Sequence, residues 1–293
     1  MAINFENQVV LVTGGTRGLG REFSLCLGAS GATVAVNSTT SDDAGVIDTI
    51  TGSGGQAAHF AGLVERPDSL IEAVVERFGR LDAIIHNAGF VRDKTLRKMT
   101  DEQWQEVIDV HLSAAFKLTR AAWPHFEAAG GGRIVFISSA SGLYGNFGQS
   151  NYAAAKMGMY GLARSISMEG GRSNITCNCV APVGATTMNS GHWSDRDKEI
   201  RKAEYVAPLV AYLAHSSCEE SGSFFETSAG SYKKLRWERT EGLNLFPADT
   251  PVTIDTIAEN WQTITSFELT EHPQSMADSR SEEHTSELQS PDH

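Results

Sequence analysis

The chain has 293 residues, 41% of them hydrophobic and 20% charged, and a formal net charge of −12. Its length allows one large domain or two small ones, and the acidic balance argues against a nucleic-acid partner, which normally requires a basic face. Four cysteines are too few for a disulfide scaffold, no apolar run is long enough to cross a membrane, and the first residues lack a signal-peptide pattern, so we expect a cytoplasmic protein with no membrane partner.

Short β-rich runs alternate with longer helical patterns over the first 230 residues. We expect strands at 8–13, 32–37, 56–60, 83–87, 133–138, 175–180 and 223–228, and helices at 18–30, 43–52, 67–78, 101–129 and 151–169. Such alternation is typical of a parallel sheet with helices on both faces, because parallel strands need crossover connections. The sequence therefore predicts an α/β domain at 1–230 with a single doubly wound, Rossmann-type parallel sheet of about seven strands.

The chain after residue 230 has a different composition. Residues 231–270 include a basic, amphipathic run at 233–239 and a short helical pattern at 253–267 with Trp261, and we expect them to form an extension packed on the same domain. Residues 271–293 are polar and acidic, which predicts a disordered tail. From about residue 280, the string RSEEHTSELQS resembles the translation of a sequencing-adapter oligonucleotide, so we expect this end to be artefactual and the natural C-terminus to be missing. A natural acidic tail is the alternative.

A glycine-rich turn lies between the first predicted strand and the first predicted helix, in the string TGGTRGLG at 13–20. Glycines allow a tight turn and a close approach of the backbone to a pyrophosphate, and the helix N-terminus offers free N–H groups. This context favours dinucleotide binding over a turn that only solves a packing problem. The residues expected to contact the cofactor here are Thr13, Gly14, Thr16, Arg17, Gly18, Leu19 and Gly20.

The end of the second predicted strand bears on which dinucleotide is bound. An acidic residue about 20 residues past the glycine turn binds the ribose 2′-hydroxyl in many NAD-binding proteins, but Ser38 stands at this strand end. The Arg17 guanidinium can hold a 2′-phosphate together with Ser38, so NADP is slightly favoured over NAD. Two alternatives stay open: Arg17 is a solvated loop charge, or Asp42 and Asp43 fold back and favour NAD.

Three polar residues are spaced to converge beside the cofactor. Ser139 follows the strand at 133–138, and Tyr152 and Lys156 share a helix face because they are four residues apart. We expect Ser139 to donate a hydrogen bond to the substrate oxygen and Tyr152 to act as general acid or base. The Lys156 ammonium is expected to lower the pKa of the phenol below its usual value of about 10 and to hold the nicotinamide ribose. An ordinary exposed Tyr–Lys pair is the alternative.

The TGxxxGxG turn, the YxxxK pair and an NAG tripeptide at 87–89 together resemble the short-chain dehydrogenase/reductase family. The resemblance implies an oxidoreductase that uses NAD or NADP. Gly62 or Leu63 stands where the family often has an adenine-binding aspartate. The positions for which the resemblance implies further cofactor contacts are Leu63, Asn87, Ala88, Gly89, Tyr152, Lys156, Pro182 and Thr187.

Longer strings resemble the (3R)-hydroxyacyl-CoA dehydrogenase units of peroxisomal type 2 multifunctional enzymes. They are VHL at 110–112, LTRAAW at 118–123, SSASGLYGNFGQ at 138–149 and KLRWERT at 234–240. This likeness implies a 3-hydroxyacyl-CoA-type substrate, a homodimer or homotetramer, and a peroxisomal location if the source is eukaryotic. The alternatives are a steroid or other carbonyl reductase of the same family and, from another class, a non-catalytic NAD(P)-binding sensor or scaffold.

His111 stands where the family's catalytic group usually has an asparagine. We expect its imidazole, which can donate and accept hydrogen bonds, to hold a water that links Lys156 to solvent. A buried structural histidine bonded to a helix carbonyl is the alternative. We expect no metal site, because the histidines and cysteines lack zinc-ligand spacing, and we expect Cys177 and Cys179 to lie in the core.

Overall fold

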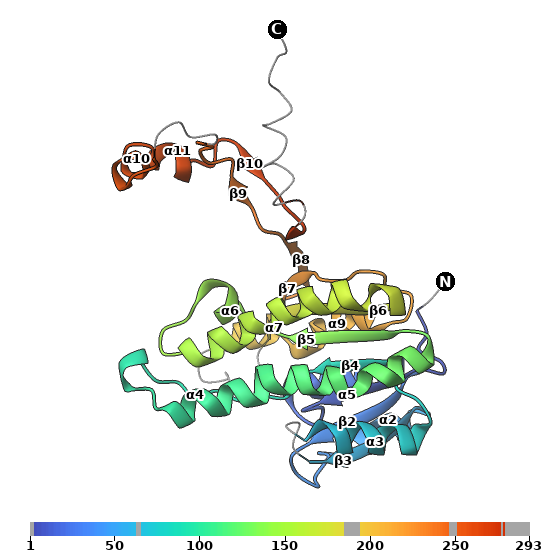
Figure 1. Ribbon diagram of the computed structural model, residues 1–293. Helices are drawn as coiled ribbons and strands as arrows, with labels where there is room; N and C mark the ends of the chain where they lie inside the picture. The colour runs from blue at the N-terminus through green and yellow to red at the C-terminus, as the bar shows by residue number, and fades with distance from the viewer. Residues whose placement is uncertain (1–2, 63–65, 185–193, 246–250, 277, 279–293) are drawn as a thin grey trace. The chain divides into compact units, whose positions relative to one another are not determined.

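The computed structural model describes residues 3–62, 66–184, 194–245, 251–276 and 278. The chain divides into two compact units, Met1–Lys234 and Leu235–His293 (Figure 1). This boundary lies close to the predicted one at residue 230. The packing of residues 231–270 on the domain stays a prediction. None of the helices within the described residues has the length and apolar character needed to cross a membrane.

The first unit contains one eight-stranded sheet with the strand order β3-β2-β1-β4-β5-β6-β7-β8. All paired strands from β3 to β7 run parallel, which confirms the doubly wound α/β fold. The strands are β1 (Val9–Thr13), β2 (Thr33–Ser38), β3 (Gln56–Ala61), β4 (Ala83–His86), β5 (Gly132–Ile137), β6 (Ile175–Val183), β7 (Phe224–Ser228) and β8 (Ser231–Leu235).

The sheet has one strand more than the seven predicted, because β8 forms where only the start of the extension was expected. Ala229 and Gly230 both have positive φ, 50° and 75°, as in the tight turns that join strands of a hairpin. Tyr232, Lys233 and Lys234 in β8 are exposed, which is typical of an edge strand protected by charge. The basic run therefore begins as the edge of the sheet.

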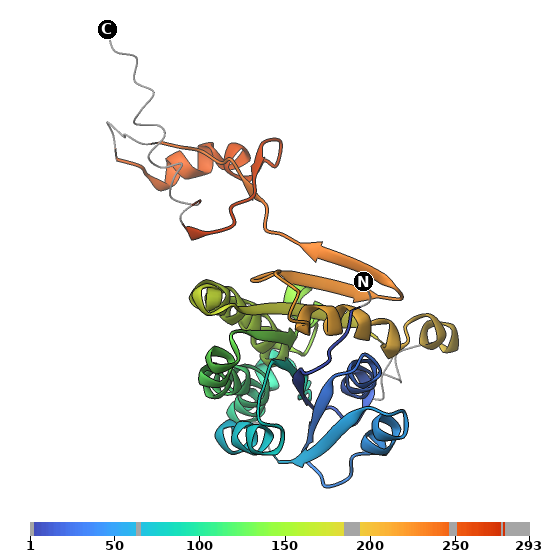
Figure 2. The same ribbon diagram turned by 90° about the vertical axis from the view of Figure 1, so that its right-hand side faces the viewer.

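Helices cover both faces of the sheet, as predicted (Figure 2). One face carries α1 (Gly18–Ala29), α2 (Val46–Gly52) and α9 (Ala207–Ala214), and the other carries α3 (Pro67–Phe78), α4 (Asp101–Ile108), α5 (Ala114–Ala129) and α7 (Ser150–Glu169). Because both faces are covered, the strands are nearly continuous apolar runs, and all five residues of β1 are buried. The short helices α6 (Ala140–Tyr144) and α8 (Asp195–Ile200), and the longer α9, have no counterpart in the prediction.

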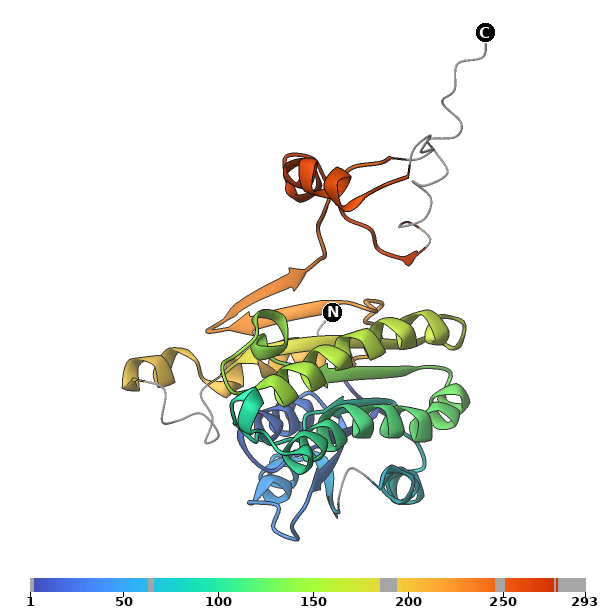
Figure 3. The ribbon, with the colours of Figure 1, turned by 60° about the vertical axis from the view of Figure 1, so that its left-hand side comes forward.

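The single helix predicted at 101–129 is interrupted, so this expectation was wrong in one respect. Between α4 and α5 lies a π-helical turn, η2 (Asp109–Ser113), in which the Ala114 N–H donates to the Asp109 carbonyl five residues back. The three segments continue along one face of the sheet beside α7 (Figure 3). This turn carries His111, and such insertions in helices are frequent at functional sites.

Arg133, the second residue of β5, is a buried cation. It lies at the N-terminal end of this strand, whereas Ser139 follows the C-terminal end. Arg133 is 4% exposed and donates to the Asn174 carbonyl (2.7 Å), the Asn174 side chain (3.2 Å) and the Ser216 carbonyl (2.6 Å). Burial lowers its pKa, and Glu219 opposes this shift. None of the ion pairs found among the described residues includes Arg133. The guanidinium thus joins three chain segments through neutral acceptors.

We expect Arg133→Met to lower the free energy of unfolding by about 2–4 kcal/mol, because the hydrogen bonds from the guanidinium to Asn174 and to the Ser216 carbonyl are lost. The free energy of unfolding of Arg133→Lys should lie between those of the wild type and Arg133→Met, since lysine keeps the charge and loses the forked contacts. Urea denaturation measures both, and the kcat of the folded variants should stay near that of the wild type. A loss below about 0.5 kcal/mol for Arg133→Met would show that these contacts add little.

Within its described residues, the second unit contains a small antiparallel pair of strands and two short helices. The strands β9 (Arg239–Thr240) and β10 (Thr270–Glu271) are joined by an ion pair, with Arg239 Nε 2.7 Å from Glu271 Oε2. The single helix predicted at 253–267 is divided into α10 (Ile254–Glu259) and α11 (Trp261–Thr265). The division falls at Asn260, whose side-chain amide donates to the Thr256 carbonyl and competes with regular helix bonding.

Candidate active site

The glycine turn has the backbone geometry that the sequence predicts. Gly14 and Gly18 have φ values of 62° and 53°, which favour glycine. A Cβ on Gly14 would lie 3.0 Å from the Ala88 Cα, and one on Gly20 would collide with the Gly14 carbonyl oxygen. Arg17, the N-cap of α1, makes no side-chain cap hydrogen bond. The turn and the uncapped helix N-terminus fit a pyrophosphate.

Thr13 and Asn87 tie the glycine turn to the end of β4. The Thr13 hydroxyl oxygen accepts from the backbone N–H groups of Asn87 and Ala88, both at 3.0 Å. The Asn87 amide donates to the carbonyls of Thr13 and Gly14, both at 3.1 Å. Hydrogen bonds from the NAG segment therefore fix the position of the glycine turn.

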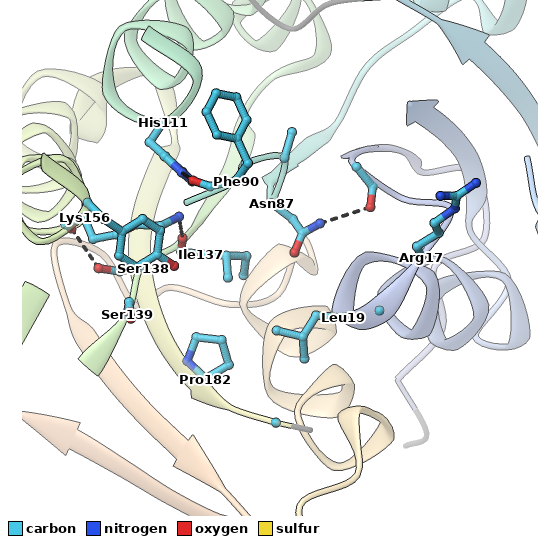
Figure 4. A pocket seen from close by; sticks show the side chains of 16 residues that line it. Arg17, Leu19, Asn87, Phe90, His111, Ile137, Ser138, Ser139, Lys156 and Pro182 are labelled. Carbon is cyan, nitrogen blue, oxygen red and sulfur yellow. Dashed lines mark hydrogen bonds between the residues drawn. The ribbon is translucent and has the colours of Figure 1, made fainter. Parts of the chain in front are cut away.

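A cavity of about 310 Å³ lies beside the glycine turn and the C-terminal ends of β4 to β6 (Figure 4). In Figure 4, Ser139 and Lys156 lie at one end of its lining and Arg17 at the other. The predicted site residues that line it are Gly14, Arg17, Gly18, Leu19, Asn87, Ala88, Gly89, His111, Ser139, Tyr152, Lys156 and Pro182.

Some predicted positions lie elsewhere, and the structure adds others. The predicted cofactor residues Thr13, Thr16, Gly20 and Ser38 are not part of the lining. Leu63 and Thr187 lie outside the described residues. The prediction missed Phe90, Ile137, Ser138 and Gly184. Phe90 and Gly184 directly follow predicted site segments, so extending those segments by one or two residues would have found them.

Ser139, Tyr152 and Lys156 converge in the cavity from two elements. Ser139 is the N-cap of α6, and its hydroxyl oxygen accepts from the Ser141 N–H at 3.1 Å and is hydrogen-bonded to Tyr152. Lys156 Nζ lies 5.4 Å from the centre of the Tyr152 ring and donates to the Ile137 carbonyl at 2.6 Å. The three polar groups thus meet at the carboxyl end of β5, where doubly wound sheets bind ligands.

The pKa of Tyr152 differs from the expectation that Lys156 makes the phenol more acidic. Burial raises this pKa, the hydrogen bond with Ser139 lowers it, and Asp93 raises it. Burial also lowers the pKa of Lys156 to about 7. Both shifts have one cause, because a low-dielectric cavity disfavours the charged form of either group. Tyr152 is therefore a protonated phenol at neutral pH, poised as an acid.

His111 is buried and bonded to a carbonyl, as in the structural alternative, but that carbonyl belongs to Phe90 in the loop after β4 and not to a helix. It is 2% exposed, its Nε2 lies 2.9 Å from the Phe90 carbonyl, and its ring meets the Tyr152 ring edge-on at 5.2 Å. Since a carbonyl only accepts, the proton is assigned to Nε2. The buried Nδ1 has no hydrogen-bond partner among the described residues. Burial lowers the pKa of this imidazole, so it is neutral and offers Nδ1 as an acceptor.

Gly89 leaves room for the His111 imidazole, because a Cβ there would collide with that ring. We expect Gly89→Ala to lower kcat by about 10–100-fold, since a shift of about 1 Å in a catalytic group has effects of this size. Steady-state kinetics and a thermal melt test this. Gly52→Ala, in α2 with no neighbouring atom within 4 Å, is the matched control and should keep its kcat. Unchanged kcat in Gly89→Ala would argue against a role for the ring.

A cation and an anion lie together where the sequence predicts the ribose 2′ position. Arg17 Nη2 lies 3.7 Å from Asp42 Oδ2, and both side chains are mostly exposed. The Ser38 hydroxyl donates to the Thr40 carbonyl at 2.9 Å and lies 2.8 Å from His59 Nε2. Asp42 thus approaches Arg17, as in the alternative left open by the sequence.

The fold and the site define a nicotinamide-dinucleotide-dependent oxidoreductase. A comparison with protein families matches residues 8–198 to the family described as short chain dehydrogenase. The chain belongs to the short-chain dehydrogenase family.

Similar proteins carry more specific names. The peroxisomal multifunctional enzyme type 2 of Mus musculus is 41% identical over 287 residues, which are 94% of this chain and 39% of that protein. The structure of the full-length enzyme of this name from Drosophila melanogaster has a TM-score of 0.85 and 37% identity, covering 97% of this chain and 50% of that one. A short chain dehydrogenase from Mycobacterium avium has a TM-score of 0.79 and 30% identity, covering 90% and 98%. The chain therefore spans half or less of the multifunctional enzymes and nearly all of the bacterial protein.

Proposed function

We propose that this chain transfers a hydride between a nicotinamide cofactor and the 3-position of a 3-hydroxyacyl- or 3-oxoacyl-CoA thioester. The observation that carries the proposal is the convergence of Ser139, Tyr152 and Lys156 in the cavity beside the glycine turn. The name of one relative, the peroxisomal hydratase-dehydrogenase-epimerase of Neurospora crassa, 40% identical over 283 residues, supports a dehydrogenase step. The strings that extend past the general family motifs support the thioester substrate.

The residues of the site have different tasks in this reaction. When bound, the nicotinamide supplies or accepts the hydride at the substrate carbon. In ketone reduction, the Tyr152 phenol gives its proton to the substrate oxygen, which becomes the alcohol, while the Ser139 hydroxyl donates a hydrogen bond to the same oxygen. Lys156 holds the cofactor ribose and, when protonated, stabilises the phenolate left on Tyr152. His111 Nδ1 accepts a hydrogen bond from a water between Lys156 and solvent.

The absorbance of the reduced nicotinamide tests this proposal directly. The protein is incubated with NADH or NADPH and a 3-oxoacyl-CoA, a steroid ketone or a simple ketone. We expect the thioester to give the highest kcat/KM. Faster turnover of a steroid or simple ketone would favour the carbonyl-reductase alternative. Dinucleotide binding without turnover of any carbonyl would favour the sensor or scaffold.

We further propose that Arg17 binds a 2′-phosphate and that Asp42 opposes it, so that NADP is slightly preferred. Arg17→Gln should lower kcat/KM for NADPH by about 10-fold or more and change that for NADH little, because a hydrogen bond between charged groups contributes about 1.5–3 kcal/mol. Asp42→Asn should raise kcat/KM for NADPH. The ratio of the two cofactors in steady-state kinetics measures both changes. Equal effects on NADH and NADPH would contradict a role at the 2′ position.

Exposed apolar side chains on two helices bear on the oligomeric state. Phe116 on α5 and Met168 on α7 are 46% and 74% exposed, and large exposed apolar side chains on neighbouring helices favour association. We propose a homodimer or homotetramer, and a monomer in light scattering would contradict it. We propose a cytoplasmic or, in a eukaryote, a peroxisomal location.

A further inference from the structure

His86 is a buried histidine that the proposed mechanism does not use. It is the last residue of β4, is 1% exposed, and pairs with Thr13 across the parallel strands β1 and β4. Its Nδ1 lies 3.3 Å from the Thr13 hydroxyl oxygen, and its Nε2 lies 3.0 Å from the His111 carbonyl oxygen. One imidazole thus connects the strand that precedes the glycine turn with the π-helical turn η2.

The direction of both hydrogen bonds follows from their partners. The Thr13 oxygen already accepts from two backbone N–H groups, those of Asn87 and Ala88, so its own proton is directed to His86 Nδ1. The His111 carbonyl can only accept, so His86 Nε2 carries the ring proton. Burial lowers the pKa of His86 to about 4, which keeps the ring neutral and able to accept at one nitrogen and donate at the other.

His111 is consequently held at two points. His86 binds its backbone carbonyl within η2, where one more residue than usual occupies the turn. The Phe90 carbonyl accepts from its ring Nε2. With these two contacts in place, the His111 ring lies edge-on to the Tyr152 ring. The buried His111 Nδ1 has no hydrogen-bond partner among the described residues, and His111 lines the cavity.

We propose that His86 is a positioning residue for the catalytic site: it connects Thr13 to the carbonyl of His111 and so holds the His111 imidazole against Tyr152. This inference rests on the proposed function for the role of His111. Thr13 is also held by the backbone N–H groups of Asn87 and Ala88, so the loss of His86 is expected to displace His111 and to leave the glycine turn in place.

Kinetics of four variants test the proposal. His86→Leu removes both hydrogen bonds and should lower kcat by about 10-fold or more, with the dinucleotide Kd changed by less than about 3-fold. His86→Gln, whose amide can both accept and donate, should recover most of the lost kcat. On a His111→Ala background, His86→Leu should cause little further loss, because residues that act through one another are not additive. An additive loss, or parallel loss of kcat and dinucleotide binding, would overturn the proposal.

A matched control separates positioning from packing. The Phe136 ring meets the His86 ring edge-on at 6.3 Å and is fully buried. Phe136→Leu disturbs the packing beside His86 and leaves the hydrogen bonds in place. It should lower the melting temperature and keep kcat within about 3-fold of the wild type. A loss of kcat as large as that of His86→Leu would mean that packing alone explains the effect.

A spectroscopic measurement makes the inference independent of turnover. Long-range ¹H–¹⁵N spectra of the imidazoles at neutral pH should show His86 and His111 as neutral tautomers protonated at Nε2. His86→Leu should shift the His111 signals, while Phe136→Leu should not. A His86 protonated at Nδ1, or His111 signals unaffected by His86→Leu, would overturn the proposal even if the enzyme is active. Absence of turnover in the wild type would instead reject the proposed function.

Discussion

Tyr152→Phe should lose about 10²–10⁴-fold in kcat, the usual contribution of a positioned acid or base. The substitution removes only the hydroxyl that exchanges a proton with the substrate oxygen. The Tyr152 ring meets the His111 ring edge-on, with 5.2 Å between the ring centres. The phenyl ring of the variant can keep this contact, so the fold and the dinucleotide Kd should change little. Absorbance of the reduced nicotinamide gives kcat, and fluorescence titration gives the Kd.

The same helix provides the control for this variant. Tyr160 also lies on α7, is 8% exposed, packs against Phe224 and is not part of the cavity lining. Tyr160→Phe should therefore keep kcat within about 2-fold of the wild type. If Tyr152→Phe and Tyr160→Phe have the same kcat as the wild type, the hydride-transfer mechanism is wrong and the sensor or scaffold alternative gains support.

Lys156→Met should lower kcat/KM by at least about 100-fold, because the cavity loses the cation beside Tyr152 and a cofactor contact. The side chain is 3% exposed and its Nζ donates to the Ile137 carbonyl. Methionine fills most of the same volume, so the fold should persist. Steady-state kinetics with the better of the two cofactors tests this expectation, and activity near that of the wild type would contradict it.

The same variant tests the buried amine through the pH dependence of stability. The pKa of Lys156 is about 7 in the folded protein and 10.5 in its ordinary state. Between these values the unfolded chain binds a proton that the folded protein does not, so the contribution of Lys156 to the free energy of unfolding rises with pH. Urea denaturation measures the free energy of unfolding of both proteins. The wild-type value minus the Lys156→Met value should rise by about 2–3 kcal/mol from about pH 7 to about pH 9. A difference that does not change with pH would contradict the lowered pKa.

The glycine turn and the YxxxK pair show what local pattern can predict. Positive φ at Gly14 and Gly18 depends on the residue type at those positions. Tyr152 and Lys156 line one cavity because residues four apart in a helix share a face. The seven predicted strands and the helices predicted at 18–30, 43–52, 67–78 and 151–169 agree with the structure to within about three residues, since their apolar patterns are continuous.

The interruption at η2 shows where local pattern is insufficient. The residues at 101–129 have an uninterrupted helical pattern, yet His111 lies in a π-helical turn held by His86 and by the Phe90 carbonyl. Both partners come from the end of β4 and the loop after it, more than 20 residues earlier in the chain. No residue type within 101–129 marks the turn, so the sequence predicted one continuous helix.

Burial produced the largest difference between expectation and structure. An ammonium four residues from a phenol predicts a lowered phenol pKa, but the pKa of Tyr152 is raised and that of Lys156 is about 7. Charge and spacing are visible in a sequence, whereas desolvation depends on which elements close over a group.

The sequence by itself determined the doubly wound sheet, the glycine turn and the membership of Ser139, Tyr152 and Lys156 in one site. These features depend on residue type and on spacing along one strand or helix. Only the tertiary structure decided the orientation of His111 and the protonation states of the buried pair Tyr152 and Lys156. Those depend on hydrogen bonds and burial among residues far apart in the chain, such as Thr13 and His86, which are 73 positions apart.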